Sequence, residues 1–124
     1  VAGQTRVICT TVGPYLRYGL EMVAACAAQG TDYCDLTGEV PFMRVSIDRH
    51  HAQAQKTGAR ILHACGFDSI PSDLGVLFLH DFLRQRGQTL DAARLIVKSM
   101  KGGASGGTLA SMMSLMEQAA ADRD

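Results

Sequence analysis

The sequence predicts an α/β fold in which helices cover a parallel sheet. Three glycines, Gly30, Gly58 and Gly87, lie at nearly even intervals, and each follows a stretch of helical composition. Glycine is favoured just beyond a helix because it adopts a positive φ without strain. An apolar run of strand length follows Gly30 and Gly58 closely, and a later run follows Gly87. This repeating strand–helix rhythm is typical of parallel sheets with helical crossovers.

Four strands and four helices fit the rhythm. The expected strands are residues 6–10, 32–36, 60–64 and 94–100. The expected helices are residues 19–29, 41–56, 71–86 and 108–121. The first strand is apolar until its last residue, which predicts burial on both faces. The fourth strand carries Arg94 and Lys98, which predicts a half-exposed strand of an edge or of another sheet.

The helices have further marks in the sequence. Pro41 and Pro71 fit first helical turns, where a missing N–H costs little. Residues 71–86 are apolar nearly all round, so we expect that helix to be buried on more than one side. The last helix carries one apolar stripe, formed by Leu109, Met112, Met113 and Met116. The stripe predicts packing in a core or an interface rather than a ligand site.

Composition restricts the class of protein and its partners. The 124 residues are 47% hydrophobic and 19% charged, as in one globular domain or part of one. Twelve basic and twelve acidic residues balance, without the basic clusters that bind nucleic acid. No apolar run approaches the roughly 20 residues of a membrane span. The four cysteines form no C-x-x-C pair, so we interpret them as reduced thiols of a cytoplasmic protein.

Open parallel sheets bind ligands beyond the carboxyl ends of their strands, and two of the loops expected there combine glycine with polar groups. In residues 10–15, Gly13 and Pro14 allow the backbone to lie flat against a planar ligand, although a tight turn also explains them. In residues 35–39, Glu39 is expected to cap a helix. Asp35 has no such simple explanation, since it ends a strand among apolar neighbours.

A third loop, residues 65–73, leads from a strand into the apolar helix. Gly66 permits a close approach of the backbone to a ligand. Ser69 or Ser72 can cap the helix, whose free N–H groups favour an anion or a carbonyl oxygen. A capped helix start without a ligand is the alternative interpretation.

Two other patterns give less support to a site. Residues 101–108 are rich in glycine but match neither the Walker pattern nor G-x-G-x-x-G, so a flexible crossover is preferred over a phosphate loop. The histidines, His50, His51, His63 and His80, lack the spacing of metal ligands. His63 and Cys65 share one side of a strand but have no further ligand, so we expect no metal site.

Taken in order, these motifs resemble the saccharopine dehydrogenase-like oxidoreductases, and most closely their bacterial branch of trans-acting enoyl reductases. The matching segments are residues 11–15, 31–39, 65–75 and the Gly106-Gly107-Thr108 motif. The resemblance implies that residues 1–90 are the second half of a Rossmann-like parallel sheet with flanking helices. It implies that residues 91–124 start a mixed α/β substrate or dimerisation domain.

The resemblance also implies an NADP or NAD cofactor and hydride transfer to a double bond or imine, as in an enoyl reductase of lipid synthesis. The implied cofactor contacts are Val12, Gly13, Pro14, Tyr15, Gly66, Phe67 and Asp68. Asp68 and Tyr15 are the candidate catalytic groups beside the nicotinamide ring. Saccharopine reductases have Gly-Leu-Asp-Pro-Gly at the third junction, whereas Ser69-Ile70-Pro71 follows Asp68 here. This departure favours a different substrate, such as a lipid-linked one, and a membrane-peripheral location is compatible with it.

The resemblance places the glycine-rich pyrophosphate loop upstream of Val1 and most of the substrate domain beyond Asp124. We therefore expect this chain alone to be inactive and to bind the cofactor weakly or not at all. One alternative is a non-catalytic module that acts through a homo-oligomer or partner, because a sheet with an open edge invites pairing. Another is a flavodoxin-like domain, which the strand–helix rhythm also permits.

Overall fold

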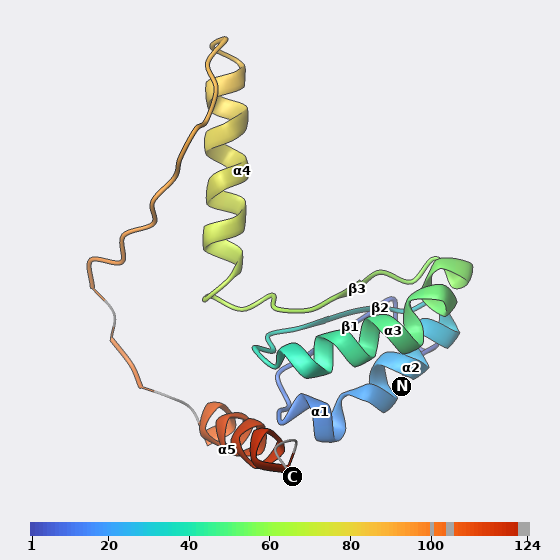
Figure 1. The fold of residues 1–124 in the computed structure, drawn as a ribbon. Coiled ribbons are helices and arrows are strands. Elements are labelled where there is room, and N and C mark those ends of the chain that lie inside the picture. Colours follow the sequence, from blue (N-terminus) through green and yellow to red (C-terminus); the bar gives the residue numbers. More distant parts are fainter. Residues whose placement is uncertain (100, 104–105, 122–124) are drawn as a thin grey trace.

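The computed structural model describes residues 1–99, 101–103 and 106–121. This part of the chain forms three parallel strands and five helices, with helices between successive strands and after the last one (Figure 1). The strands are β1 (Val7–Thr10), β2 (Asp32–Asp35) and β3 (Ile61–Leu62). The helices are α1 (Tyr15–Tyr18), α2 (Leu20–Gln29), α3 (Val40–Thr57), α4 (Ile70–Arg84) and α5 (Gly106–Ala121). The predicted α/β class is confirmed.

The sheet has the order β1-β2-β3, and every pair is parallel. Cys9 lies opposite Cys34 in the first pair, and Tyr33 lies opposite Ile61 in the second. Parallel neighbours need a crossover, and α2 and α3 provide the two helical crossovers. The first three expected strands are confirmed, each somewhat shorter than its apolar run.

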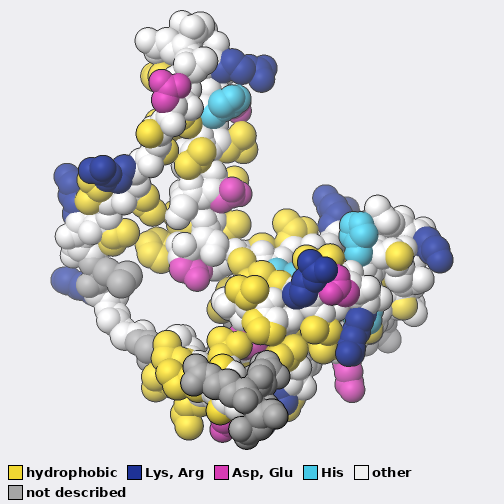
Figure 2. Space-filling model, in the orientation of Figure 1, with side chains coloured by type: hydrophobic (Ala, Val, Ile, Leu, Met, Phe, Trp, Pro, Cys, Tyr) yellow, Lys and Arg dark blue, Asp and Glu magenta, His cyan; other side chains and the backbone are white. Residues whose placement is uncertain are grey.

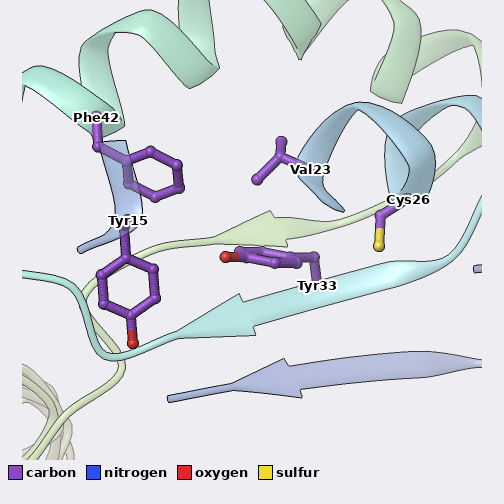
Figure 3. Close-up of a cluster of buried hydrophobic side chains, with 5 residues drawn as sticks. All are labelled: Tyr15, Val23, Cys26, Tyr33 and Phe42. Carbon is purple, nitrogen blue, oxygen red and sulfur yellow. The ribbon is translucent and has the colours of Figure 1, made fainter. Parts of the chain in front are cut away.

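The core lies between the sheet and α2 and α3, which pack on one face of it (Figure 3). Its central side chains, each at most 4% exposed, are Tyr15, Val23, Cys26, Tyr33 and Phe42. On the opposite face, Val7 of β1 is 54% exposed and Cys9 is exposed as well. The prediction that β1 is buried on both faces is therefore wrong, because these helices cover only one face.

Local signals in the sequence set the helix ends. Gly30 and Gly58 have φ values of 69° and 79°, and they terminate α2 and α3 as predicted. Pro41 and Pro71 lie in the first turns of α3 and α4, also as predicted. Gly87 has a positive φ, but α4 already ends at Arg84.

Helix α4 forms where it was expected but projects from the body of the molecule (Figure 1). None of its residues is buried, and Phe78 is 69% exposed. Figure 2 shows hydrophobic side chains spread along this projecting helix. The predicted burial of α4 is therefore wrong, because an apolar sequence does not by itself supply a surface to pack against.

No helix in the described ranges has the length and hydropathy to cross a membrane.

The chain between α4 and α5 contains no strand at residues 94–99, so the expected fourth strand is wrong for this stretch. The segment runs apart from the sheet (Figure 1), where it has no ladder to join. Met100, the last residue of that prediction, lies outside the described residues. A domain boundary at residue 90 stays a prediction.

Helix α5 returns to the body of the molecule near α1 (Figure 1). The predicted stripe is exposed, by 52% at Met112 and 65% at Met116. A neighbouring face with Ser111, Ser114 and Leu115 is half-buried instead. Packing of the methionine stripe in the core of this chain is therefore wrong, and its role in an interface stays a prediction.

Candidate functional site

Three loops meet at the carboxyl edge of the sheet: residues 11–14 after β1, 36–39 after β2 and 63–69 after β3. We call them the carboxyl-edge loops. The last two are in contact, since a Cβ built on Gly66 would lie 3.2 Å from Leu36 Cβ and 2.7 Å from Asp68 Oδ1. The two groups of residues that the sequence singled out for a cofactor therefore lie at the same edge of the sheet, with the loop after β2 between them.

Most of the predicted cofactor contacts are accessible. Val12 is 65% exposed and Phe67 is 73% exposed. Asp68 is exposed, while Gly13, Pro14 and Gly66 are half-buried. The edge thus presents two apolar side chains and one carboxylate to solvent, and their roles toward a cofactor stay predictions.

Tyr15 differs from these residues because it belongs to the core. Its side chain packs on Phe42, with ring centroids 5.6 Å apart, and its Oη donates to the Thr10 carbonyl over 3.3 Å. Burial raises the pKa of the Tyr15 phenol, and the negative charges of Asp35 and Glu39 add to the rise. The hydroxyl is therefore a weak acid, and its hydrogen bond to the Thr10 carbonyl stabilises the start of the first loop.

Glu39 is the cap that was expected, but of a different helix. It occupies the N-cap position of α3 without a capping bond there. Its carboxylate is buried and accepts the backbone N–H groups of Tyr15 at 2.8 Å and Leu16 at 2.9 Å. Pro14 precedes α1 and makes no side-chain capping bond, so Glu39 satisfies these two free donors. A loop after β2 thereby fixes the loop after β1.

Asp35, which the sequence left unexplained, is the centre of a buried hydrogen-bond network. Its Oδ2 lies 2.7 Å from Nδ1 of His63, and Nε2 of His63 lies 2.9 Å from Oγ of Ser46. Oδ1 of Asp35 accepts the backbone N–H groups of Thr37 and Ala64 at 3.1 Å and 3.2 Å. The carboxylate therefore joins the loops after β2 and β3.

The network determines the charge of Asp35. Burial alone raises the pKa of a carboxyl group, but the hydrogen bonds from His63 and the Thr37 amide outweigh it. The pKa of Asp35 is consequently held below its ordinary value. An ionised carboxylate at the sheet edge is the result.

Ser46 and His63 were not identified from the sequence as members of a site. Strand alternation would place His63 on the same face as Ile61, and so toward the core. Ser46 gives little signal, since a serine inside a helix usually faces solvent or its own backbone. Both residues also line a hollow of about 300 Å³ between α3 and β3.

The loop after β3 enters α4 without the predicted cap. Ser69 stands at the N-cap position, but its side chain makes no capping hydrogen bond, so that prediction is wrong. Ser72 lies inside the helix. The N–H groups of Ile70 and Asp73 donate to the carbonyls of Gly66 and Ser69, and Pro71 has no N–H, so this helix start offers few free donors to a ligand.

Helix α5 adds a residue that the sequence analysis did not anticipate. A Cβ built on Gly13 would lie 3.0 Å from Oγ of Ser111, so α5 reaches the first carboxyl-edge loop. The glycine-rich stretch before it is only partly described, and residues 101–103 have no regular structure. α5 thus borders the candidate site at the end of β1.

Cysteines and histidines do not form a metal centre in the part of the chain that the structure describes. The four cysteines are free thiols. Burial, together with a hydrogen bond to Cys9, raises the pKa of Cys34 to about 11. Cys34 is therefore protonated at neutral pH and a poor nucleophile.

Comparison with known proteins finds relatives over the whole chain. It is 58% identical over 125 residues to a protein of Mycobacterium tuberculosis that is provisionally named a trans-acting enoyl reductase. The match covers 100% of this chain and 30% of that protein. It is 52% identical over 124 residues to the trans-acting enoyl reductase of Mycobacterium ulcerans, with 98% and 30% covered. For the Mycobacterium leprae trans-acting enoyl reductase the values are 51% over 118 residues, with 94% and 28% covered.

No family model and no solved structure matches the chain. The chain thus spans about 30% of the length of the curated relatives that it matches, and these homologues are named trans-acting enoyl reductases.

Proposed function

We propose that this chain is a segment of an NAD(P)-dependent oxidoreductase of the saccharopine dehydrogenase-like family, which reduces the double bond of an enoyl group on a lipid-linked substrate. The observation that carries the proposal is the similarity to mycobacterial enoyl reductases along the whole chain. The imine reduction of other members of that family is the second substrate class that the proposal leaves to experiment.

The fold supports this assignment. Strands β1, β2 and β3 follow one another in parallel, with both crossover helices on one face. One half of a Rossmann-like doubly wound sheet has this arrangement, and such sheets bind dinucleotides at the carboxyl ends of their strands. In the proposed enzyme, the segment 1–90 supplies that half, and residues 91–124 begin the substrate domain.

The carboxyl-edge loops suit a flat aromatic ring next to a polar group. Gly13 and Gly66 lack side chains where the loops are closely packed, since a Cβ would lie 3.0 Å from Ser111 Oγ at the first position and 2.7 Å from Asp68 Oδ1 at the second. The exposed side chains of Val12 and Phe67 offer apolar surface, and Asp68 offers a hydrogen-bond acceptor. A reduced nicotinamide supplies the hydride in reactions of this class, and the protein binds and orients it. NADP and NAD are both compatible with these residues.

A chimera tests the proposal in a complete enzyme. The M. tuberculosis relative would carry this chain in place of its matching segment, and NADPH and NADH would be titrated by fluorescence. We expect binding, and consumption of the bound nucleotide with an α,β-unsaturated acyl thioester. Gly13→Val should weaken binding at least tenfold, about 1.4 kcal/mol, because its side chain crowds the loop. Gly75→Val is the matched control, since Gly75 lies in α4 outside the carboxyl-edge loops and a Cβ there meets nothing within 4 Å.

A folded chimera that binds neither nucleotide would contradict the proposal. Equal affinities of the Gly13 and Gly75 variants would remove the first loop from the cofactor site. Neither outcome depends on choosing the correct acyl substrate, because the primary readout is binding.

A non-catalytic module is the second candidate, and the exposed apolar residues of α4 favour it. Leu77 and Phe78 are 54% and 69% exposed, as expected of a surface that another protein or copy covers. Light scattering after size exclusion separates the two candidates for this chain. A dimer that Phe78→Asp dissociates supports the module, and a monomer at working concentration argues against its homo-oligomeric form.

A further inference from the structure

The imidazole of His63 lies at the start of the third carboxyl-edge loop and is not among the predicted cofactor contacts. Both of its ring nitrogens have partners, Asp35 on one side and Ser46 on the other. Its side chain is 9% exposed and that of Asp35 is 0% exposed. The rings of Phe42 and Tyr33 contact it edge-on, with centroids 4.9 Å and 5.9 Å away. Hydrogen bonds and packing together hold His63 in one orientation.

The order Ser46–His63–Asp35 has the spacing of a hydrolase triad, but its setting does not suit acyl transfer. Ser46 lies inside α3, where the backbone N–H groups are committed to the helix ladder. A nucleophile of that kind needs neighbouring N–H donors that are free to bind an oxyanion. Ser46 is also only 2% exposed. The arrangement is therefore suited to orienting Asp35 and not to attacking a substrate.

Asp35, held in place by His63, is hydrogen-bonded to the backbone of two carboxyl-edge loops. One oxygen faces His63, and the other accepts the amides of Thr37 and Ala64. Thr37 continues the chain of contacts, since its Oγ1 accepts the backbone N–H of Glu39 at 3.0 Å. Glu39 in turn holds the start of α1 after the first loop. Two buried carboxylates, joined through Thr37, thus connect all three loops.

Ala64 shows that the third loop needs this support. Its φ is 57°, in the left-handed region that favours glycine, and it is the one non-glycine residue with a positive φ in the described part of the chain. The strained conformation requires surrounding contacts to persist. The bond from its N–H to Asp35 is such a contact, and it lies two residues before Gly66.

We propose that His63 is a positioning residue, which fixes the carboxylate of Asp35 and through it the backbone of the loops after β2 and β3. The inference rests on the proposed function only for its consequence, namely that these loops receive the nicotinamide. His63 itself need not touch the cofactor or the substrate.

Two conservative variants separate the two sides of the imidazole. The side-chain amide of Asn can replace Nδ1, and that of Gln can replace Nε2. His63→Asn should therefore keep the bond to Asp35, whereas His63→Gln should keep only the bond to Ser46. Ser46→Ala is the further control, because it leaves the Asp35 side of the imidazole intact. A role in packing alone predicts similar effects for Asn and Gln.

The primary readout is amide hydrogen exchange by NMR on the 124-residue chain. We expect His63→Gln to speed exchange at the amides of Thr37 and Ala64 at least tenfold, and His63→Asn and Ser46→Ala to change it less than threefold. Adding Ala64→Gly to His63→Gln should not restore the Thr37 amide, because glycine relieves strain only at position 64. Equal exchange in the Asn and Gln variants, or no change in either, would overturn the positioning role.

The second readout is the nicotinamide affinity of the chimera. His63→Gln should weaken it about tenfold and His63→Asn less than threefold, while Ala64→Gly should recover part of the loss in the Gln variant. If the amides respond as expected but even the unmodified chimera binds no nucleotide, the positioning role is supported and the proposed function fails. If the nucleotide binds and the amides do not respond, the proposed function is supported and the positioning role is overturned.

Discussion

Residues 1–69 and residues 70–121 have similar proportions of apolar side chains, but only the first region buries them in a core. In the first region, α2 and α3 lie against a sheet, and the enclosed core includes Tyr33 and Phe42 at 0% exposure. In the second, no residue of α4 is buried. The difference teaches that apolar composition makes burial favourable, while a second layer makes it possible. It also predicts where substitutions will be costly.

The largest contrast should come from two phenylalanines. Phe42→Ala removes a fully buried ring that contacts Tyr15 and His63, and we expect it to lower the free energy of unfolding by about 3–5 kcal/mol. Phe78→Ala on α4 should change it by less than about 0.5 kcal/mol. Urea unfolding followed by circular dichroism measures both. Equal losses would mean that α4 packs in solution and that the two regions are one core.

The next contrast compares two glutamates. Glu39→Gln keeps the shape of a buried side chain but removes the charge that caps α1, so we expect a loss of about 1.5–3 kcal/mol. Glu21→Gln makes the same change at an exposed position and should cost less than about 0.5 kcal/mol. The same unfolding measurement applies. If Glu39→Gln left the free energy of unfolding unchanged, the charge would contribute nothing to this cap.

Two aspartates with lowered pKa values give a contrast in pH dependence. The pKa of Asp35 is lowered in the buried network, and that of Asp32 is lowered by its exposed pair with Arg60. A carboxylate whose folded-state pKa lies below the unfolded value of about 3.9 stabilises fully above about pH 5, and this stability is lost as the pH falls further. Asp35→Asn should therefore flatten the decline in stability between about pH 5 and pH 3 more than Asp32→Asn does.

Thermal unfolding across that pH range, with both variants and the unchanged protein, measures the effect. The exposed pair is screened by water and salt, so 0.5 M salt should reduce the Asp32 contribution and spare that of Asp35. The opposite ranking would indicate that the buried network does not hold Asp35 in its ionised form.

The smallest contrast compares two Ala→Gly substitutions, whose expected effects on the free energy of unfolding have opposite signs. Ala64→Gly removes a positive-φ strain and should stabilise the chain by about 0.5–1 kcal/mol. Ala52→Gly, at an exposed position inside α3, should destabilise it by about 1 kcal/mol because glycine weakens a helix. Both are read from shifts in the urea midpoint. A destabilising Ala64→Gly would mean that its backbone is not strained in solution.

The sequence predicted the elements whose signals are local. Gly30 and Gly58 predicted helix ends because positive φ is a property of single residues. Pro41 predicted a first turn for a similar reason. The strand at 94–99 failed because strands need a partner, and no pattern within one segment says whether a partner lies beside it.

The candidate site was predictable only in part. Loops at the carboxyl ends of parallel strands must share an edge, so the location of residues 11–14 and 63–69 on one edge of the sheet followed from topology. The contact of His63 with Asp35 spans two strands, and that of Glu39 with α1 spans two helices, so neither appears as a spacing in the sequence. The exposure of α4 likewise depends on its direction after residue 69, which composition does not encode.

The central claim is that the carboxyl-edge loops receive a nicotinamide cofactor. Hydrogen–deuterium exchange of the chimera with and without saturating NADPH or NADH tests it most directly. The account predicts that the nucleotide slows exchange in residues 11–15 and 66–68 and leaves the carboxyl-terminal half of α3 unchanged. Binding that protects other parts of the enzyme while both loops exchange at their original rates would contradict it.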